Sequence, residues 1–257
     1  MLERKAELCL RQCEEDHRSL VMADQDFDID SLARYLHLSP AVVLRMAERG
    51  QLPGRKVRGQ WKFDPSEIHH WLEERIGASE EEELVQVEEA LDKSHQQSEP
   101  IIISELLPVE AIEPRLPART RNSVIEAMTN LAARTGKLWD PVAMAAAVRA
   151  RESLHSTALE NGVALLHPRR PQPSLLAEPI LALGRTVSGI PFGGPTGCLT
   201  DLFFLICSVQ DAQHLRTLAR LSRLLAREGF VAQLRDAPDA PSMWHIIRQF
   251  ESELDTP

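Results

Sequence analysis

The acidic residues of this chain are concentrated in one stretch, and this divides the sequence into parts that must fold separately. Residues 76–100 hold eight acidic side chains and one basic side chain, whereas residues 101–257 balance at 16 of each. A high density of charges of one sign with few apolar residues predicts a solvated linker. The spacing of Leu84, Val87 and Leu91 is also compatible with a short amphipathic helix in this stretch. We therefore expect a helical extension at 1–26, a small domain at 27–77, an acidic linker at 78–100 and a large domain at 101–257.

The remaining composition is that of an ordinary globular protein. The first residues lack the continuous apolar stretch of a signal peptide, and the longest apolar run, 202–207, is far shorter than the roughly 20 residues of a membrane span. We expect a cytoplasmic protein with no membrane association.

The cysteines at 9, 13, 198 and 207 have no paired metal-ligand spacing, so we expect reduced thiols, no metal site and no cofactor. Apolar residues in 1–26 recur at near-heptad spacing, so a homodimer formed through a coiled coil is one alternative.

Residues 27–77 carry clear signals for the start and end of helices. Asp30 is expected to cap a first helix, and Ser39 followed by Pro40 is typical of the start of a second one that ends at Gly50. Residues 55–63 alternate around a glycine-containing turn, as a hairpin does. A capping-box-like start at Asp64 predicts a last helix that ends near Gly77. The order is helix, turn, helix, hairpin, helix.

Positive charge gathers on the second helix and the hairpin of this unit. Residues 45–62 hold six cations against the single acid Glu48. A phosphate backbone binds such a surface by counterion release, and a helix flanked by a hairpin suits a DNA groove. Docking of this face on the acidic linker or on another protein is the alternative. The candidate DNA-binding residues are Arg45, Arg49, Arg55, Lys56, Arg58 and Lys62.

Residues 27–77 resemble the excisionase/MerR-like winged helix-turn-helix family. The matching segments are 29–36, 39–43, Arg49-Gly50-Gln51-Leu52-Pro53 and Gly59-Gln60-Trp61-Lys62-Phe63. The resemblance implies that 39–48 is the recognition helix, with Arg45 and Arg49 reaching double-stranded DNA. It also implies backbone contacts from the wing by Arg55, Arg58 and Lys62.

Residues 101–257 alternate between helical and strand-like patterns, which predicts an α/β domain with a mixed sheet flanked by helices. The expected helices are 120–136, 141–151, 213–228 ending at Gly229, and one around Trp244, Ile247 and Phe250; the expected strands are 163–166, 180–183 and 202–208.

One segment of this domain predicts phosphoryl chemistry. Residues 151–167 combine an arginine, hydroxyl side chains and a glycine with an apolar strand that ends at His167. A neutral imidazole nitrogen is a good nucleophile at physiological pH, and an arginine offers a planar fork of donors to the phosphoryl oxygens. A second imidazole, His214, lies where a polar turn enters a long helix. These residues suggest a histidine that accepts a phosphoryl group.

The large domain resembles the enzyme IIA component of the bacterial phosphotransferase system, of the fructose/mannitol and nitrogen-regulatory type (type 2). The matches include Ile103-Ser104-Glu105-Leu106-Leu107, Asn161-Gly162-Val163-Ala164, Gly189-Ile190-Pro191-Phe192 and Asp201-Leu202-Phe203-Phe204-Leu205. The resemblance implies that His167 is the phosphoacceptor, Arg151 binds the phosphoryl group, and His214 lies beside His167. It assigns supporting roles to Ser156, Thr157, Asn161 and Gly162, and names the histidine-containing phosphocarrier protein as the donor.

Three residues depart from the family pattern. Leu166 stands where the family has proline before the histidine, and Ala158 and Glu160 replace glycines, with Glu160 expected to bring negative charge toward the phosphoryl group. His155 matches no family residue and is expected to face solvent. Asp201 is either a capping residue or a functional group.

The sequence as a whole favours a DNA-binding regulatory protein that accepts a phosphoryl group on His167 and thereby signals metabolic state. In this hypothesis the protein is a phosphocarrier and not a stand-alone catalyst. Two alternatives stay open: a sugar-transport phosphocarrier, and an interaction scaffold without phosphoryl transfer.

Overall fold

The computed structural model describes residues 26–36, 38–65, 67–68, 71–72, 101–194 and 197–254. The chain divides into two compact units, with the boundary between Leu72 and Glu73. Apart from Asp26, the predicted extension at 1–26 lies outside the described residues, Cys9 and Cys13 included. The predicted linker at 78–100 and the residues His69, His70 and Gly77 also lie outside them.

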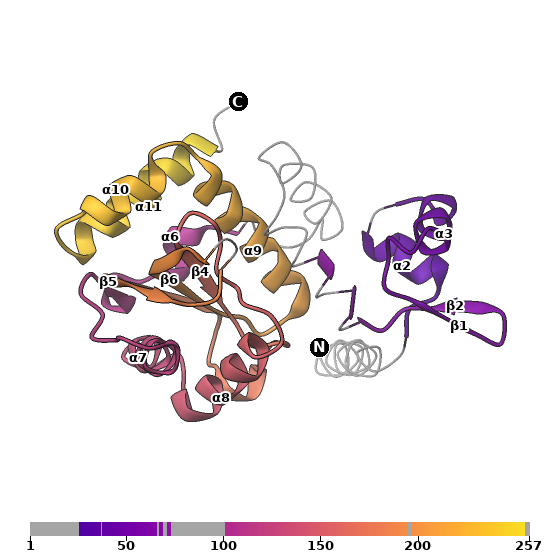
Figure 1. Cartoon of the computed structure of the whole chain (residues 1–257), viewed down its shortest axis with the longest axis horizontal. Coiled ribbons are helices and arrows are strands. Elements are labelled where there is room, and N and C mark those ends of the chain that lie inside the picture. Colours follow the sequence, from indigo (N-terminus) through magenta and orange to yellow (C-terminus); the bar gives the residue numbers. More distant parts are fainter. Residues whose placement is uncertain are drawn as a thin grey trace, which may run out of the picture. The chain divides into compact units, whose positions relative to one another are not determined.

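The described part of the small unit, indigo in Figure 1, contains two helices, α2 (Ile29–Leu36) and α3 (Pro40–Glu48). The Ser39 side chain accepts a hydrogen bond from the Val42 N–H, and Pro40 occupies the first turn, so the predicted start of α3 is confirmed. The predicted cap of α2 is wrong. Asp28, not Asp30, accepts from the Ser31 N–H at 2.7 Å, because only a residue ahead of the helix can reach its unpaired N–H groups.

The hairpin consists of β1 (Arg55–Val57) and β2 (Gln60–Lys62), as the alternation predicts. Arg58 and Gly59 form its two-residue turn with φ of +51° and +82°, which matches the right-handed twist of the strands. Phe63 is fully buried below the hairpin, and Ile68 and Leu72 of the following helical segment are also buried. This aromatic and aliphatic core holds the hairpin against the helices.

The large unit is built on a four-stranded mixed sheet. Its strands are β3 (Ile112–Glu113), β4 (Val163–Leu166), β5 (Ile180–Pro191) and β6 (Leu199–Cys207), in the order β3-β5-β6-β4. β5 and β6 run antiparallel, while β3 is parallel to β5 and β4 is parallel to β6. The predicted bounds of β4 are confirmed, whereas β5 is longer than predicted and the two-residue β3 was missed. The predicted mixed α/β fold is confirmed.

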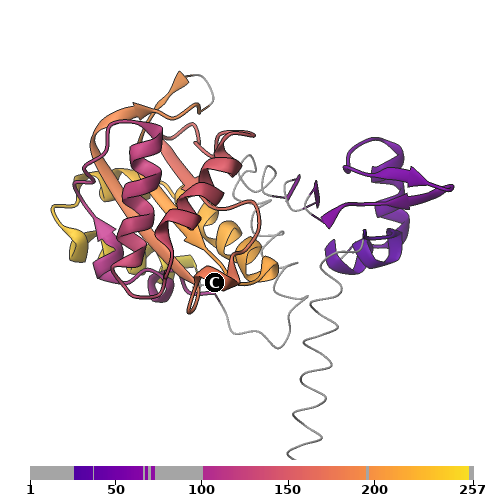
Figure 2. The ribbon, with the colours of Figure 1, turned by 90° about the horizontal axis from the view of Figure 1, so that it is seen from below.

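Helices cover both faces of the sheet (Figures 1 and 2). α7 (Arg121–Ala133) and α8 (Pro141–Glu152) lie on one face, and α9 (Asp211–Ala226), α10 (Phe230–Asp236) and α11 (Ala240–Leu254) lie on the other. Thr120 and Asp140 cap α7 and α8. The predicted end of α9 at Gly229 is wrong: α9 ends at Ala226, and Gly229, with φ of +80°, is the N-cap residue that precedes the unpredicted α10.

Short elements complete the unit: α6 (Ile103–Leu106) and two 3₁₀ turns, Val109–Ala111 and Pro173–Leu175. No helix in the part of the chain that the structure describes combines the length and apolar character needed to cross a membrane.

A buried carboxylate joins α6 to α11 in the large unit. Glu251 of α11 accepts hydrogen bonds from the Ile103 N–H at 2.5 Å, the Ser104 N–H at 3.0 Å and the Ser104 hydroxyl at 2.8 Å. Arg220 of α9 donates to the same carboxylate at 3.3 Å. The charge is therefore neutralised inside the protein, and its donors come from two other helices.

Removing this carboxylate should destabilise the large unit. We expect Glu251→Ala to lower the free energy of unfolding by about 3–5 kcal/mol, because it removes the buried ion pair with Arg220 and leaves two backbone N–H groups without this acceptor. Urea unfolding followed by circular dichroism measures this. Glu253→Ala, at an exposed position on the same helix, should change stability by no more than about 0.5 kcal/mol. Equal losses in the two variants would contradict this role for Glu251.

Candidate functional site

The parallel pairing of β4 and β6 brings the two predicted histidines together. Leu166, the last residue of β4, lies opposite Leu205 near the end of β6, so both strands end at the same edge of the sheet. His167 follows β4 directly, and His214 lies in the first turn of α9, which begins shortly after β6. The rings are buried, and their centroids are 5.0 Å apart at an angle of 55°. This adjacency agrees with the expectation for His167 and His214.

The hydrogen bond of His167 fixes its tautomer. Its Nδ1 lies 2.8 Å from the carbonyl oxygen of Leu165. Since a carbonyl oxygen only accepts, Nδ1 carries the proton and Nε2 holds the lone pair of the neutral ring. The Nδ1 of His214 lies 3.4 Å from the hydroxyl of Ser208, the residue that follows β6.

Arg151 lies in the last turn of α8, and its side chain is buried. Its Nη1 donates to the carbonyl oxygen of His155 at 2.9 Å, which fixes the guanidinium to the loop that leads back toward β4. His155 itself is exposed, as predicted.

The two predicted hydroxyl donors have partners within the protein. Ser156 donates to the carbonyl oxygen of Phe192 at 2.8 Å. The Thr157 hydroxyl donates to Oε1 of Glu152, and the Thr157 N–H donates to the same oxygen at 3.1 Å. Glu152 was missed at the sequence level, because nothing in a helix-ending glutamate signals a threonine partner in the next loop.

Glu152 is a buried carboxyl among cationic neighbours. Burial raises the pKa of Glu152 above its ordinary value, while the hydrogen bonds from Thr157 and the charges of Arg121 and Arg151 act in the opposite direction. Arg121, at the start of α7, also donates to the Phe192 carbonyl and lies 5.1 Å above the Phe192 ring. Two guanidinium groups thus lie near the loop that carries Ser156 and Thr157.

Asn161 and Gly162 lie at the opposite end of β4 from His167. A strand advances about 3.3 Å per residue, so the length of β4 separates them from the imidazole and they cannot contact a group bound there. The same holds for Glu160, which is exposed on the far side of Asn161. The expectation that Glu160 brings charge toward the phosphoryl group is therefore wrong.

Gly162 is required by its surroundings. Its φ is +77°, and a Cβ there would lie 2.6 Å from Nη2 of Arg235 and 3.1 Å from the carbonyl oxygen of Leu199. Only glycine combines this backbone conformation with such a close approach.

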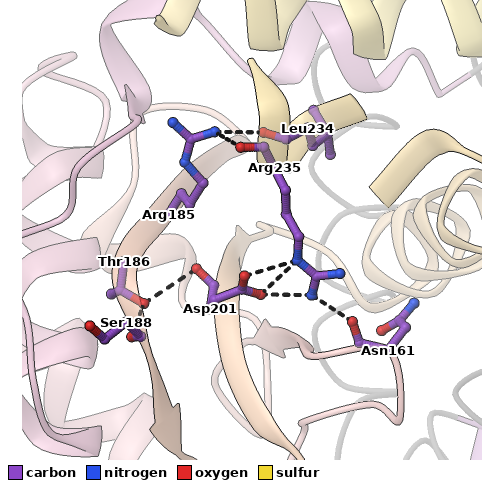
Figure 3. Close-up of polar contacts among 7 residues, drawn as sticks. All are labelled: Asn161, Arg185, Thr186, Ser188, Asp201, Leu234 and Arg235. Carbon is purple, nitrogen blue, oxygen red and sulfur yellow. Dashed lines mark hydrogen bonds and ion pairs between the residues drawn. The ribbon is translucent and has the colours of Figure 1, made fainter. Parts of the chain in front are cut away.

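Figure 3 shows the polar network at this end of the sheet. Asp201 of β6 accepts two hydrogen bonds from Nε of Arg235, at 2.9 and 3.1 Å, and one from Nη2 at 2.7 Å. The same Nη2 donates to the carbonyl oxygen of Asn161 at 2.7 Å, and Arg185 donates to backbone carbonyls of α10. Asp201 is neither a cap nor part of the histidine site. It is the ion-pair partner that fixes α10 to the sheet.

The small unit presents its predicted cations on α3 and the hairpin. Arg45 is exposed on α3, Arg49 is exposed at the C-cap of α3, and Arg58 is exposed at the hairpin turn, while Lys62 is half-buried. Two cations of the hairpin also have partners within the unit: Arg55 forms an ion pair with Asp26 at 2.8 Å, and Lys56 lies 5.1 Å above the ring of Trp61. Trp61 is half-buried and stacks on the buried Phe63, so it packs against the core.

Cys198 and Cys207 are free thiols, as predicted, and burial raises the pKa of Cys207 to about 12. Within the described ranges, no group of three or more His, Cys, Asp or Glu side chains is placed to hold a metal ion.

Substitution of Gly162 should destabilise the large unit. We expect Gly162→Ala to cost about 1–3 kcal/mol from the left-handed backbone alone, with a further loss from the contact with Arg235. Gly136→Ala is the matched control, since Gly136 has a φ of +74° but no atom within 4 Å of the place that a Cβ would take. A loss in Gly162→Ala that does not exceed the control would contradict the steric argument. Thermal unfolding measures both.

Glu152→Gln should change how stability depends on pH. The raised pKa of Glu152 means that the fold favours the protonated carboxyl, a contribution fully present below the ordinary value of 4.5 and lost as the pH rises through the folded pKa. We therefore expect Glu152→Gln to gain stability relative to the wild type as the pH rises above the ordinary value of 4.5. Urea unfolding at several pH values measures the difference. Glu126→Gln, on the exposed face of α7, controls for the loss of one carboxylate. A difference that falls with pH would contradict the assignment.

Comparison with known proteins gives two family matches. Residues 105–250 match the model for the phosphoenolpyruvate-dependent sugar phosphotransferase system, EIIA 2. Residues 27–76 match the model for a helix-turn-helix domain.

Individual proteins agree with these matches. The chain is 33% identical over 150 residues to a nitrogen regulatory protein of Bradyrhizobium diazoefficiens, covering 56% of this chain and 94% of that protein. It is 32% identical over 151 residues to the fructose-specific EIIABC component of Bacillus subtilis, covering 58% of this chain but only 23% of that protein. The nitrogen regulatory protein IIA-Ntr of Neisseria meningitidis shares the fold, with a TM-score of 0.51, 24% identity, and coverage of 56% of this chain and 98% of that chain.

With this fold and these matches, the chain belongs to the EIIA 2 family of the phosphoenolpyruvate-dependent sugar phosphotransferase system, and a helix-turn-helix domain precedes its EIIA domain.

Proposed function

We propose that this chain is a cytoplasmic DNA-binding regulator whose EIIA domain accepts a phosphoryl group on His167 from the histidine-containing phosphocarrier protein. The observation that carries the proposal is the pairing of His167 and His214 at one sheet edge, with Nδ1 of His167 held on the Leu165 carbonyl. The nitrogen-regulatory relatives support a regulatory role. We propose the domain limits 1–26, 27–77, 78–100 and 101–257.

The proposed transfer uses Nε2 of His167 as the nucleophile. Its lone pair attacks the phosphorus of a phosphohistidine on the donor, and the N–P bond of the donor breaks as the Nε2–P bond forms. The donor imidazole leaves neutral, and His167 takes over the positive ring charge while its Nδ1–H still donates to the Leu165 carbonyl oxygen. In this proposal Arg151 and His214 provide donors to the phosphoryl oxygens.

Two features of the site favour a working acceptor over an inactive scaffold. Glu160 is kept away from His167 by the length of β4, which removes one electrostatic objection. Leu166 is fully buried within β4 and pairs with Leu205, so it continues the strand up to His167 without the family's proline.

Phosphorylation of His167 can be measured directly. Incubation with phosphoenolpyruvate, enzyme I and the phosphocarrier protein should give one acid-labile phosphate on the wild type and none on His167→Ala. His155→Ala, at an exposed histidine close in sequence, is the control that should still be labelled. No label on the folded wild type would favour the scaffold, and label on His167→Ala would place the acceptor elsewhere.

We propose that the cationic surface of α3 and the hairpin binds double-stranded DNA. The proposed contacts are made by Arg45, Arg49, Arg55, Lys56, Arg58 and Lys62. The exposure of Arg45, Arg49 and Arg58 supports such a role, because exposed cations release counterions when they meet phosphates. The partners of Arg55 and Lys56 within the unit leave these two less free to contact DNA.

DNA binding should depend steeply on salt. We expect Arg45→Ala and Arg58→Ala each to reduce the slope of log K against log salt by about 1, because each removes one phosphate contact. Arg34→Ala, exposed on α2 and outside the proposed surface, should leave the slope unchanged. Filter binding over a salt series measures this. Salt-independent binding by the wild type would contradict phosphate contacts.

The sugar-transport phosphocarrier is the competing function, because a fructose-specific component is among the relatives. A chain that is phosphorylated on His167 but does not bind DNA would favour transport. The regulatory proposal further requires that phosphorylation change the DNA affinity, since a phosphoryl group adds up to about two negative charges. Identical affinities for the wild type, its phosphorylated form and His167→Ala would exclude that coupling.

A further inference from the structure

The loop between α8 and β4 contains a polar pair to which the proposed transfer assigns no role. Oε1 of Glu152 accepts both the N–H and the hydroxyl proton of Thr157. Both residues are at least nine-tenths buried, with 3% of Glu152 and 9% of Thr157 exposed. Within the described part of the chain, Oε2 of Glu152 has no hydrogen-bond partner. A carboxyl that is buried at this desolvation cost needs a reason to be there.

This pair lies between the two parts of the phosphoryl site. Glu152 is the next residue after Arg151 and ends α8. On the other side, the Thr157 carbonyl oxygen accepts from the Leu165 N–H at 3.2 Å, and the Leu165 carbonyl oxygen accepts from Nδ1 of His167 at 2.8 Å. A continuous series of hydrogen bonds therefore runs from the end of α8 to the imidazole of His167.

The segment that carries Thr157 is also fixed along the edge of β4. Ala158 forms an antiparallel bridge with Ala164, and the Leu159 N–H donates to the Val163 carbonyl at 2.8 Å. Thr157 is thus where the edge of β4 meets the helix that carries Arg151. A displacement of Thr157 would change the position of Arg151 relative to His167. It would also move Leu165, whose carbonyl oxygen accepts the hydrogen bond from Nδ1 of His167.

We infer that Glu152 and Thr157 are positioning residues for phosphoryl transfer. Their hydrogen bonds hold Arg151 in position relative to His167 and keep the proton of the His167 ring on Nδ1. Glu152 acts as a hydrogen-bond acceptor, not through its charge, so glutamine can replace it. This inference rests on the proposed function of His167. Effects of this kind are large, because misplacing catalytic groups by about 1 Å can cost about 100-fold in rate.

The test compares two disruptive variants with two conservative ones in the full chain. Thr157→Val removes the hydroxyl donor, and Glu152→Leu removes the acceptor. We expect each to slow phosphorylation of His167 by roughly tenfold or more, while Thr157→Ser and Glu152→Gln stay within about threefold of the wild type. Thermal melting of all four variants identifies any that do not fold. If a disruptive variant does not fold, the conservative variants are compared with the wild type instead.

A second readout does not require phosphorylation. Nitrogen-15 NMR of the imidazole reports which ring nitrogen of His167 carries the proton. We expect the Nδ1–H tautomer in the wild type, Thr157→Ser and Glu152→Gln, and a mixture of tautomers in Thr157→Val and Glu152→Leu. If the wild type is not phosphorylated, the proposed function fails, but the tautomer measurement still tests the positioning role. An unchanged rate or tautomer in the folded disruptive variants, or equal losses in the conservative ones, would overturn the inference.

Discussion

The histidine site depends on the parallel pairing of β4 with β6. Because the two strands run in the same direction, the chain leaves both at one edge of the sheet, and the residues that follow them meet there. An antiparallel pair would send His167 and the start of α9 to opposite edges. The apolar residues of β4, all buried, hold the strand in this register, so the core packing of four residues decides where the imidazole lies.

The two ends of β4 have separate functions. At the end that precedes the strand, Gly162, Asp201 and Arg235 form a structural junction that fixes α10 to the sheet. At the end that follows the strand, the buried rings of His167 and His214 form the site. This separation explains how Glu160 replaces a glycine of the family pattern without bringing its charge to the site.

The sequence predicted the elements whose signals are local. The structure confirms the start of α3 after Ser39, the start of α8 after Asp140 and the bounds of β4 at 163–166. These could be predicted because capping and strand patterns act between near neighbours. The two-residue β3 and the short α10 have too few residues to show a period. The hydrogen bonds of Glu152 with Thr157 and of Glu251 with Ile103 arise only when the chain folds, so no local pattern signals them.

The most direct test of this account is the position of the phosphoryl group on the ring. The Nδ1 hydrogen bond to Leu165 leaves Nε2 of His167 as the nitrogen that acts as the nucleophile in the proposed transfer. Phosphorus-31 and nitrogen-15 NMR of the chain after phosphorylation should therefore show one phosphoramidate, on Nε2 of His167. A phosphoryl group on Nδ1 of His167, or on His214, would contradict the account.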